Sequence, residues 1–420
     1  MSTAIRHFSS RTSASLDLSR KGFGSKVKRF SMRNKFYSLA ILLLLPSACA
    51  TSSGNTNKDL PPLPSGMSEI RSISPSTTKD DDLKPILALT EKAEIIGLGE
   101  SAHTSEGFYQ AKARIVQTLV SKGGVRSIAF EDSFVSVQSV NDYILAGKGS
   151  AKDATQKLYR VWHSKTIADL FDWLRTYNKE HPTDPVKIFG FDFANGTQTL
   201  AALSDYSNND LGPLQKEIKA CSALIDDGDK ASEALCKSCI DLGAALAQES
   251  GKTFDRTAGI SLGFAAKRAC NIKDIAKRNS IRDEGMAALL TMKLKDPTTI
   301  KKTLVWSANG HLQKVANNPA VRTMGSYLQE AYKDKLVVIY IAADRFDTIP
   351  QFDFITPQEK AAPGSPEAWL ATYQRDYIFA DLSKIPLETM GLTEENKSMA
   401  TAYIDGIFYL KHSPVMKLYE

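Results

Sequence analysis

Short apolar segments alternate with amphipathic segments along most of the chain. After the first apolar segment, Phe108, Ala111, Ile115 and Leu119 lie at helical spacing within residues 105–121. The apolar segments, each typical of a buried strand, are residues 94–99, 126–130, 186–191, 303–307, 335–341 and 405–410. Alternating strands and helices predict an α/β fold with a mostly parallel sheet flanked by helices. We expect the last of these segments to lie near the sheet edge.

A long helical stretch interrupts the strand pattern from about residue 210 to residue 294, and we interpret it as a helical insertion. It carries four of the five cysteines, and an even number in an exported protein suggests two disulfides. Either Cys221 pairs with Cys236 and Cys239 with Cys270, or the crossed alternative applies. A zinc site starting from Cys236-x-x-Cys239 would need a second close pair, which the sequence lacks.

Residues 1–48 have the features of a signal peptide, for which Met32 is a more typical start than Met1. Basic residues precede an apolar run at 36–45, which is shorter than the about 20 residues that a bilayer-spanning helix needs. Small residues then precede Cys49, as in the lipobox of bacterial lipoproteins, although Pro46 stands where leucine is usual.

We therefore expect Cys49 to be lipidated and residues 49–69 to form the lipid anchor and a flexible linker. Residues 70–420 would form the folded domain. The protein would be periplasmic or at the cell surface, held at the membrane through its N-terminal lipid anchor.

The net charge of +6 does not indicate a nucleic-acid partner. Nine basic residues and one acid precede Cys49, which leaves 44 basic and 46 acidic residues in the remainder, a net charge of −2. The positive charge thus belongs to the predicted signal peptide and not to a binding surface.

Polar side chains follow four of the predicted strands. Glu100 and His103 follow the first strand, Glu131 the second, Asp192 the third and His311 the fourth. Because the carboxyl ends of parallel strands meet at one edge of the sheet, we expect these side chains to share a site. A histidine accepts a proton near neutral pH, and a carboxylate on its other ring nitrogen orients it. The set predicts activation of water for ester cleavage.

Two other chemistries compete with this interpretation. Glu100, His103, Glu131 and His311 would also make a plausible metal site. Residues 259–263 match the G-x-S-x-G motif of serine hydrolases. That motif should follow a buried strand, whereas here it lies in the helical insertion, so we interpret it as a chance match.

Several longer motifs resemble the erythromycin esterase family, in the expected order from about residue 90 to the C-terminus. They are LGESAHTSEGFYQAKARIVQTLV from residue 98, IAFEDS from 128, VW…LFDWLRTYN over 161–178, IFGFDF from 188, RDEGM from 282, VWSANGHLQK from 305 and YIDGIFYLKHSP from 403. Family members commonly carry a further histidine where this chain has Ala308, which bears on the substrate.

The resemblance implies that His103 is the general base, supported by Glu100, Glu131 and His311. It implies that Lys112 contacts the substrate, and we add Asp192 and Trp162 to the substrate-binding residues. The reaction expected is hydrolysis of a carboxylic ester or a macrolide-type lactone, without a metal or other cofactor. Alternatives are a metal-dependent hydrolase or protease, and a lipoprotein that binds haem or another small molecule.

Overall fold

The computed structural model describes residues 60–193, 215–228, 231–249, 253–296, 302–315, 321–352, 355–386, 390 and 402–420. The predicted signal peptide, Cys49 and most of the predicted linker lie outside these residues. Within them, no helix combines the length and apolar character that crossing a membrane requires.

Among the described residues, eight strands form one sheet in the order β1-β7-β8-β6-β2-β5-β3-β4. All neighbours from β8 to β4 are parallel, and β7 is antiparallel to both β1 and β8. The strands are β1 (Met67–Glu69), β2 (Ile95–Glu100), β3 (Ser127–Ser133), β4 (Lys187–Asp192), β5 (Thr303–Trp306), β6 (Leu336–Phe346), β7 (Tyr377–Asp381) and β8 (Gly406–Ser413). The predicted α/β fold with a mostly parallel sheet is confirmed.

Two details of the sheet differ from the expectation. The segment expected near the edge, now β8, is third in the sheet because β7 and β1 add to it antiparallel. The pattern also gave no sign of β1 and β7, which are only three and five residues long.

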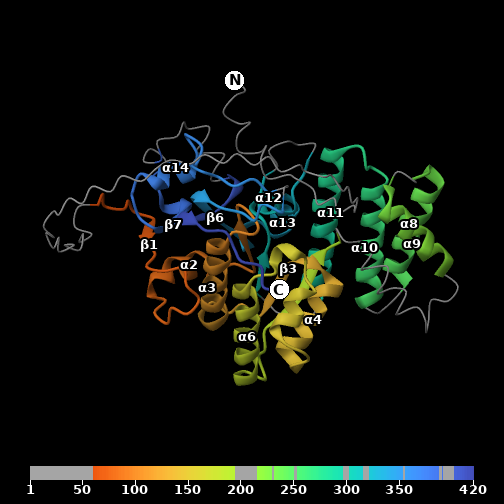
Figure 1. Ribbon diagram of the computed structural model, residues 1–420, viewed down its shortest axis with the longest axis horizontal. Coiled ribbons are helices and arrows are strands. Elements are labelled where there is room, and N and C mark those ends of the chain that lie inside the picture. Colours follow the sequence, from red (N-terminus) through yellow and green to blue (C-terminus); the bar gives the residue numbers. More distant parts are fainter. Residues whose placement is uncertain are drawn as a thin grey trace, which may run out of the picture.

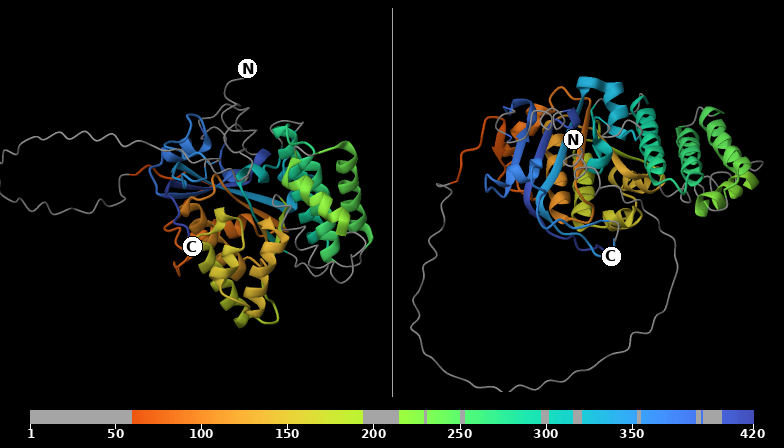
Figure 2. Two further views of the ribbon diagram at one scale, coloured as in Figure 1. Left: turned by 45° about the vertical axis from the view of Figure 1, so that its right-hand side comes forward. Right: turned by 90° about the horizontal axis from the view of Figure 1, so that it is seen from above.

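Helices cover both faces of the sheet (Figures 1 and 2). One face packs against α3 (Glu106–Lys122), α4 (Phe134–Ala146) and α6 (Lys165–Glu180), and the other against α11 (Ile275–Leu294), α13 (Met324–Tyr332) and α14 (Pro366–Ala371). Successive side chains of β5 point to opposite faces of the sheet. Leu304 and Trp306 pack in the layer that includes α3, α4 and α6, and Val305 packs in the layer that includes α11, α13 and α14, so both faces are apolar. Further short helices are α2 (Lys84–Leu89), α5 (Ala151–Gln156) and α12 (Asn309–Leu312).

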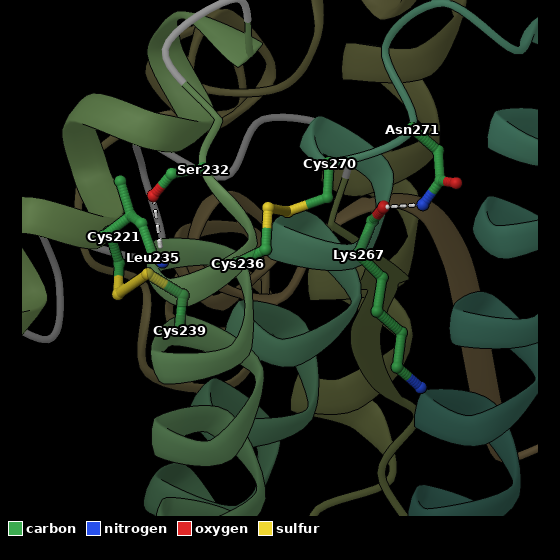
Figure 3. Close-up of a disulfide and its surroundings, with 8 residues drawn as sticks. All are labelled: Cys221, Ser232, Leu235, Cys236, Cys239, Lys267, Cys270 and Asn271. Atoms are coloured by element: carbon green, nitrogen blue, oxygen red, sulfur yellow. Dashed lines mark hydrogen bonds between the residues drawn. A yellow bond between two sulfur atoms is a disulfide. The ribbon is translucent and has the colours of Figure 1, made fainter.

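The helical insertion has a core of its own, built by α8 (Gln215–Asp226), α9 (Glu233–Glu249) and α10 (Thr253–Ala269). Disulfides join Cys221 to Cys239 and Cys236 to Cys270 (Figure 3), so the crossed alternative is the correct pairing. One bridge links α8 to α9, and the other links α9 to the end of α10.

The G-x-S-x-G match lies in the interior of α10, where Ser261 is fully buried. The first glycine of the match, Gly259, allows close helix packing, because a Cβ there would lie 2.5 Å from the backbone nitrogen of Ala247 on α9. Likewise, a Cβ on Gly243 of α9 would lie 2.5 Å from the backbone nitrogen of Gly263 on α10. Glycines at these positions let α9 and α10 approach closely.

Candidate active site

Four neighbouring strands bring the polar residues to one edge of the sheet. Strand β2 leads to Glu100 and His103, and its neighbour β5 leads to His311 on α12. Next in the sheet, β3 carries Glu131 and β4 ends at Asp192. These are the side chains that the sequence suggested would meet, and they form two hydrogen-bonded clusters.

The first cluster is centred on Glu100, which is fully buried. Its Oε1 lies 2.8 Å from Nδ1 of His103, and its Oε2 accepts a hydrogen bond from Nζ of Lys112. Lys112 also donates to the carbonyl oxygen of Ser307 at 3.2 Å, and its Nζ lies 4.2 Å from the centre of the Trp306 ring. Burial lowers the pKa of Lys112 to about 8, although the charge of Glu100 opposes this shift.

The loop that carries His103 is held in an unusual backbone conformation. Thr104 has φ = 63°, in the left-handed region that a β-branched residue rarely adopts. Its NH donates to Oη of Tyr109 at 2.9 Å, its Oγ1 accepts from the NH of Ile349 at 3.1 Å, and its carbonyl accepts from the NH of Met416 at 2.9 Å. These contacts fix the chain next to His103.

The second cluster is centred on Arg282 of α11. Its Nη2 donates to Oε1 of Glu131 at 2.9 Å and to Oδ2 of Asp192 at 2.7 Å, and its Nη1 lies 2.8 Å from Nε2 of His311. Nδ1 of His311 lies 2.9 Å from Oδ1 of Asp283. The helical stretch thus contributes two charged residues to the site.

Charges in this cluster are strongly coupled. Burial alone would raise the pKa of Glu131, but the charges of His311 and Arg282 outweigh it and hold the pKa well below its usual range. Burial likewise works against protonation of His311, yet Asp283 and Glu131 raise its pKa. Glu131 also accepts hydrogen bonds at 2.7 Å from Oγ of Ser307 and from the NH of Ala308.

His311 has two hydrogen-bonding states. When its ring is neutral, Nδ1 donates to Asp283 and Nε2 accepts from Arg282. When it is protonated, Nε2 carries a hydrogen and can no longer accept from Arg282, and Oε1 of Glu131 at 3.5 Å becomes its acceptor.

The side chains of the two clusters differ in their exposure to solvent. The side chains of His103, Arg282 and His311 are 18%, 16% and 19% exposed. Lys112, Asp192 and Trp162, which we expected at the substrate, are at most 1% exposed. Lys112 lies behind Glu100, Asp192 binds Arg282, and Trp162 packs edge-on at 4.7 Å against the ring of His103 while donating to the carbonyl of Glu131. The structure therefore gives these three residues supporting positions.

Sequence reasoning missed Arg282 and Asp283 as site residues. The RDEGM motif contained both, but its place on a helix of the insertion gave no sign that it reaches the strand ends. Packing of α11 against β4 puts them there.

The central carboxylates of both clusters face cations. Among the residues that the structure describes, no group of three or more histidine, cysteine or acidic side chains could hold a metal ion. Each carboxylate that might serve faces a cation instead: Glu100 binds Lys112, and Glu131 binds Arg282.

Comparison with known proteins identifies the family. The family model described as erythromycin esterase matches residues 120–412. The chain belongs to the erythromycin esterase family. Membership places it among hydrolases of the macrolide esterase type. The matched residues include Glu131, Asp192, Arg282 and His311, and they begin after His103.

Solved structures share the fold. A protein from Bacillus cereus is 19% identical with a TM-score of 0.70, and the match covers 84% of this chain and 97% of that chain. A succinoglycan biosynthesis protein is 17% identical with a TM-score of 0.68, over 84% and 96%. A variant of the erythromycin esterase EreC in an open conformation is 16% identical with a TM-score of 0.68, over 84% and 99%. At these identities the likeness concerns the fold.

Proposed function

We propose that this member of the family hydrolyses a carboxylic ester or lactone with a water molecule activated by His103. The observation that carries the proposal is the bond between Nδ1 of His103 and Glu100 at 2.8 Å. When Nδ1 donates its hydrogen to Glu100, Nε2 is left as the proton acceptor. Within the described part of the chain, Nε2 has no hydrogen-bond partner of its own.

In the proposed reaction, Nε2 of His103 takes a proton from water as the water oxygen bonds to the carbonyl carbon. The carbonyl electron pair moves onto oxygen, and the resulting oxyanion is stabilised by the cation of Arg282 and by His311. The tetrahedral intermediate then breaks its bond to the alcohol oxygen, which receives the proton from His103. An ester yields an acid and an alcohol, and a lactone yields a hydroxy acid.

The supporting residues keep these groups in their charge states. Lys112 pairs with Glu100, the carboxylate that bonds to Nδ1 of His103. Asp192 and Glu131 raise the pKa of Arg282 against the effect of burial, so the guanidinium stays charged. Asp283 and Glu131 favour protonation of His311, which adds a second positive charge beside that of Arg282.

The test is a hydrolysis screen of simple esters, aliphatic lactones and macrolides, in which mass spectrometry detects addition of one water to the substrate. Parallel samples are treated with a chelator, and their metal content is measured by elemental analysis. We expect turnover of at least one class of substrate, unchanged by chelation. Loss of activity on chelation, restored by zinc or manganese, would replace the proposal with a metal-dependent hydrolase.

A further inference from the structure

Three arginines line the junction of α10 and α11 beside the candidate active site. Arg278 and Arg282 are four residues apart on α11 and share one face of this helix. Arg268 lies in the last turn of α10, which the turn of residues 270–274 joins to α11. Arg282 is the residue that contacts His311.

The three arginines differ in their partners. Arg282 binds two carboxylates, Glu131 and Asp192. Arg278 is 7% exposed, and its one hydrogen bond among the described residues is a long one, 3.5 Å from Nη1 to the carbonyl oxygen of Ile272. The Nε atoms of Arg278 and Arg268 are both buried without a hydrogen-bond partner, and neither side chain forms an ion pair within the described ranges.

An anion would give the two buried Nε atoms the hydrogen-bond partner that they lack among the described residues. A buried charge without a partner destabilises a fold strongly. Arg278 lies in the first turn of α11, the positive end of the helix dipole, which adds to the cost. Burial and the charges of Arg282 and Arg278 also lower the pKa of Arg268 to about 10, so positive charge accumulates here.

We propose that Arg268 and Arg278 form a subsite for an anionic group of the substrate, a carboxylate or a phosphate. Guanidinium groups match the geometry of both anions. The inference rests on the proposed ester hydrolysis and adds a substrate class to it. Arg278 is one helical turn from Arg282, about 6 Å along the axis, so the anionic group is a few bonds from the scissile carbonyl.

The test compares para-nitrophenyl esters that differ in the charge at the end of the acyl chain. The neutral substrate is the butyrate ester. The two anionic substrates are the monoester of glutaric acid, which ends in a carboxylate, and the carboxylic ester of phosphonopropionic acid, which ends in a phosphonate. The cationic substrate is the ester of trimethylammoniobutyric acid. We expect kcat/KM of the wild type to be at least about 10-fold higher for one or both anionic esters than for the neutral ester, and lowest for the cationic ester.

Arg278→Gln and Arg268→Gln should each reduce the ratio of kcat/KM between the anionic and neutral esters by about 10-fold. The matched control is Lys277→Gln, which removes the neighbouring, exposed positive charge on α11 and should keep the wild-type ratio. Equal kcat/KM for anionic and neutral esters in the wild type, or an unchanged ratio in both arginine variants, would overturn the subsite.

A binding measurement separates failure of the subsite from failure of the proposed function. Glutarate or inorganic phosphate should raise the Tm of the wild type and of Lys277→Gln, but not that of Arg278→Gln. Without ligand, Arg278→Gln should be at least as stable as the wild type, because it removes an unpaired buried charge. If no ester is hydrolysed yet this stabilisation occurs, the hydrolase proposal fails and the anion site stands. Absence of the stabilisation refutes the anion site.

Discussion

His103 is held from three directions. Glu100 bonds to Nδ1, Trp162 packs edge-on against the ring, and Thr104 fixes the backbone that follows. A left-handed threonine costs about 1–3 kcal/mol, which its three hydrogen bonds offset. These contacts restrict the orientation of the His103 ring more than that of an unpaired histidine on a loop.

Replacing His103 tests the assigned base directly. We expect His103→Ala to retain the fold and to lose kcat by about 100-fold or more, the scale expected for removal of a general base. Circular dichroism checks folding, and initial rates on the best ester measure activity. The control His181→Asn alters an exposed histidine stacked on Tyr177 and should leave kcat unchanged. Full activity of His103→Ala would remove this residue from the mechanism.

Glu131 makes stability depend on pH. Its pKa is lowered in the folded state, so its contribution is present above the usual carboxyl pKa of about 4.3 and is lost as the pH falls towards its native value. Glu131→Gln should lower the free energy of unfolding at pH 7 by about 3 kcal/mol, because Arg282 loses a buried partner.

Urea unfolding at several pH values between about 7 and 3 measures this effect. The variant should be nearer to the wild type at the acid end, because there Glu131 takes up a proton in the unfolded wild type while it stays ionised in the folded one. Glu180→Gln, at an exposed position, serves as the control. A difference between variant and wild type that does not change with pH would contradict the coupling.

At the scale of elements, the segment that follows β8 forms hydrogen bonds with the loop that carries His103. Pro414 accepts a hydrogen bond from the NH of Glu106 at 2.7 Å, the NH of Met416 donates to Thr104 at 2.9 Å, and the NH of Tyr419 donates to His163 at 2.9 Å. The segment therefore ties together the loops that carry His103 and Trp162.

Ending the chain after Pro414 should reduce kcat by at least about 10-fold, because small displacements of a catalytic group are costly. The expected change is in kcat more than in KM, with the sheet intact by circular dichroism. Lys417→Ala, an exposed side chain in the same segment, should behave as the wild type. Unaltered kcat in the truncated protein would show that the loop holds its geometry alone.

The disulfides stabilise the small core of α8, α9 and α10. They close loops with sequence separations of 18 and 34 residues. On the chain-entropy account, replacing Cys236 and Cys270 together by serine should cost this core about 3–4 kcal/mol. Hydrogen exchange should show faster exchange in α9 and α10 and little change in the sheet. Uniform destabilisation of the whole chain would instead indicate that the insertion and the sheet unfold as one unit.

At the scale of the whole molecule, we propose that the enzyme is anchored at a membrane by lipid on Cys49. The proposal rests on the apolar run and the small residues before this cysteine, which lie outside the described residues. In the expressing bacterium, Cys49→Ser should move the protein from the membrane fraction to the soluble fraction and abolish labelling by palmitate. Ser52→Ala is the matched control. A wild-type protein that takes up no palmitate would refute the anchor.

The sequence by itself determined the α/β class, six of the eight strands that the structure describes and the residues at four strand ends, because the alternation of short apolar segments with amphipathic ones is a local property of the chain. It could not show β1 and β7, whose three and five residues are too short for a periodic signal. Nor could spacing decide the cysteine pairing, since both alternatives fit the same helices.

Tertiary structure alone decided which side chains face each other. Arg282 and Asp283 are far from His311 in sequence and meet it because α11 packs on β4, while Lys112 of α3 is fully buried and donates to Glu100 and to the carbonyl oxygen of Ser307. The physical reason is that hydrogen bonds and ion pairs act over a few ångströms. Their partners depend on how elements pack, and no pattern within one element contains that information.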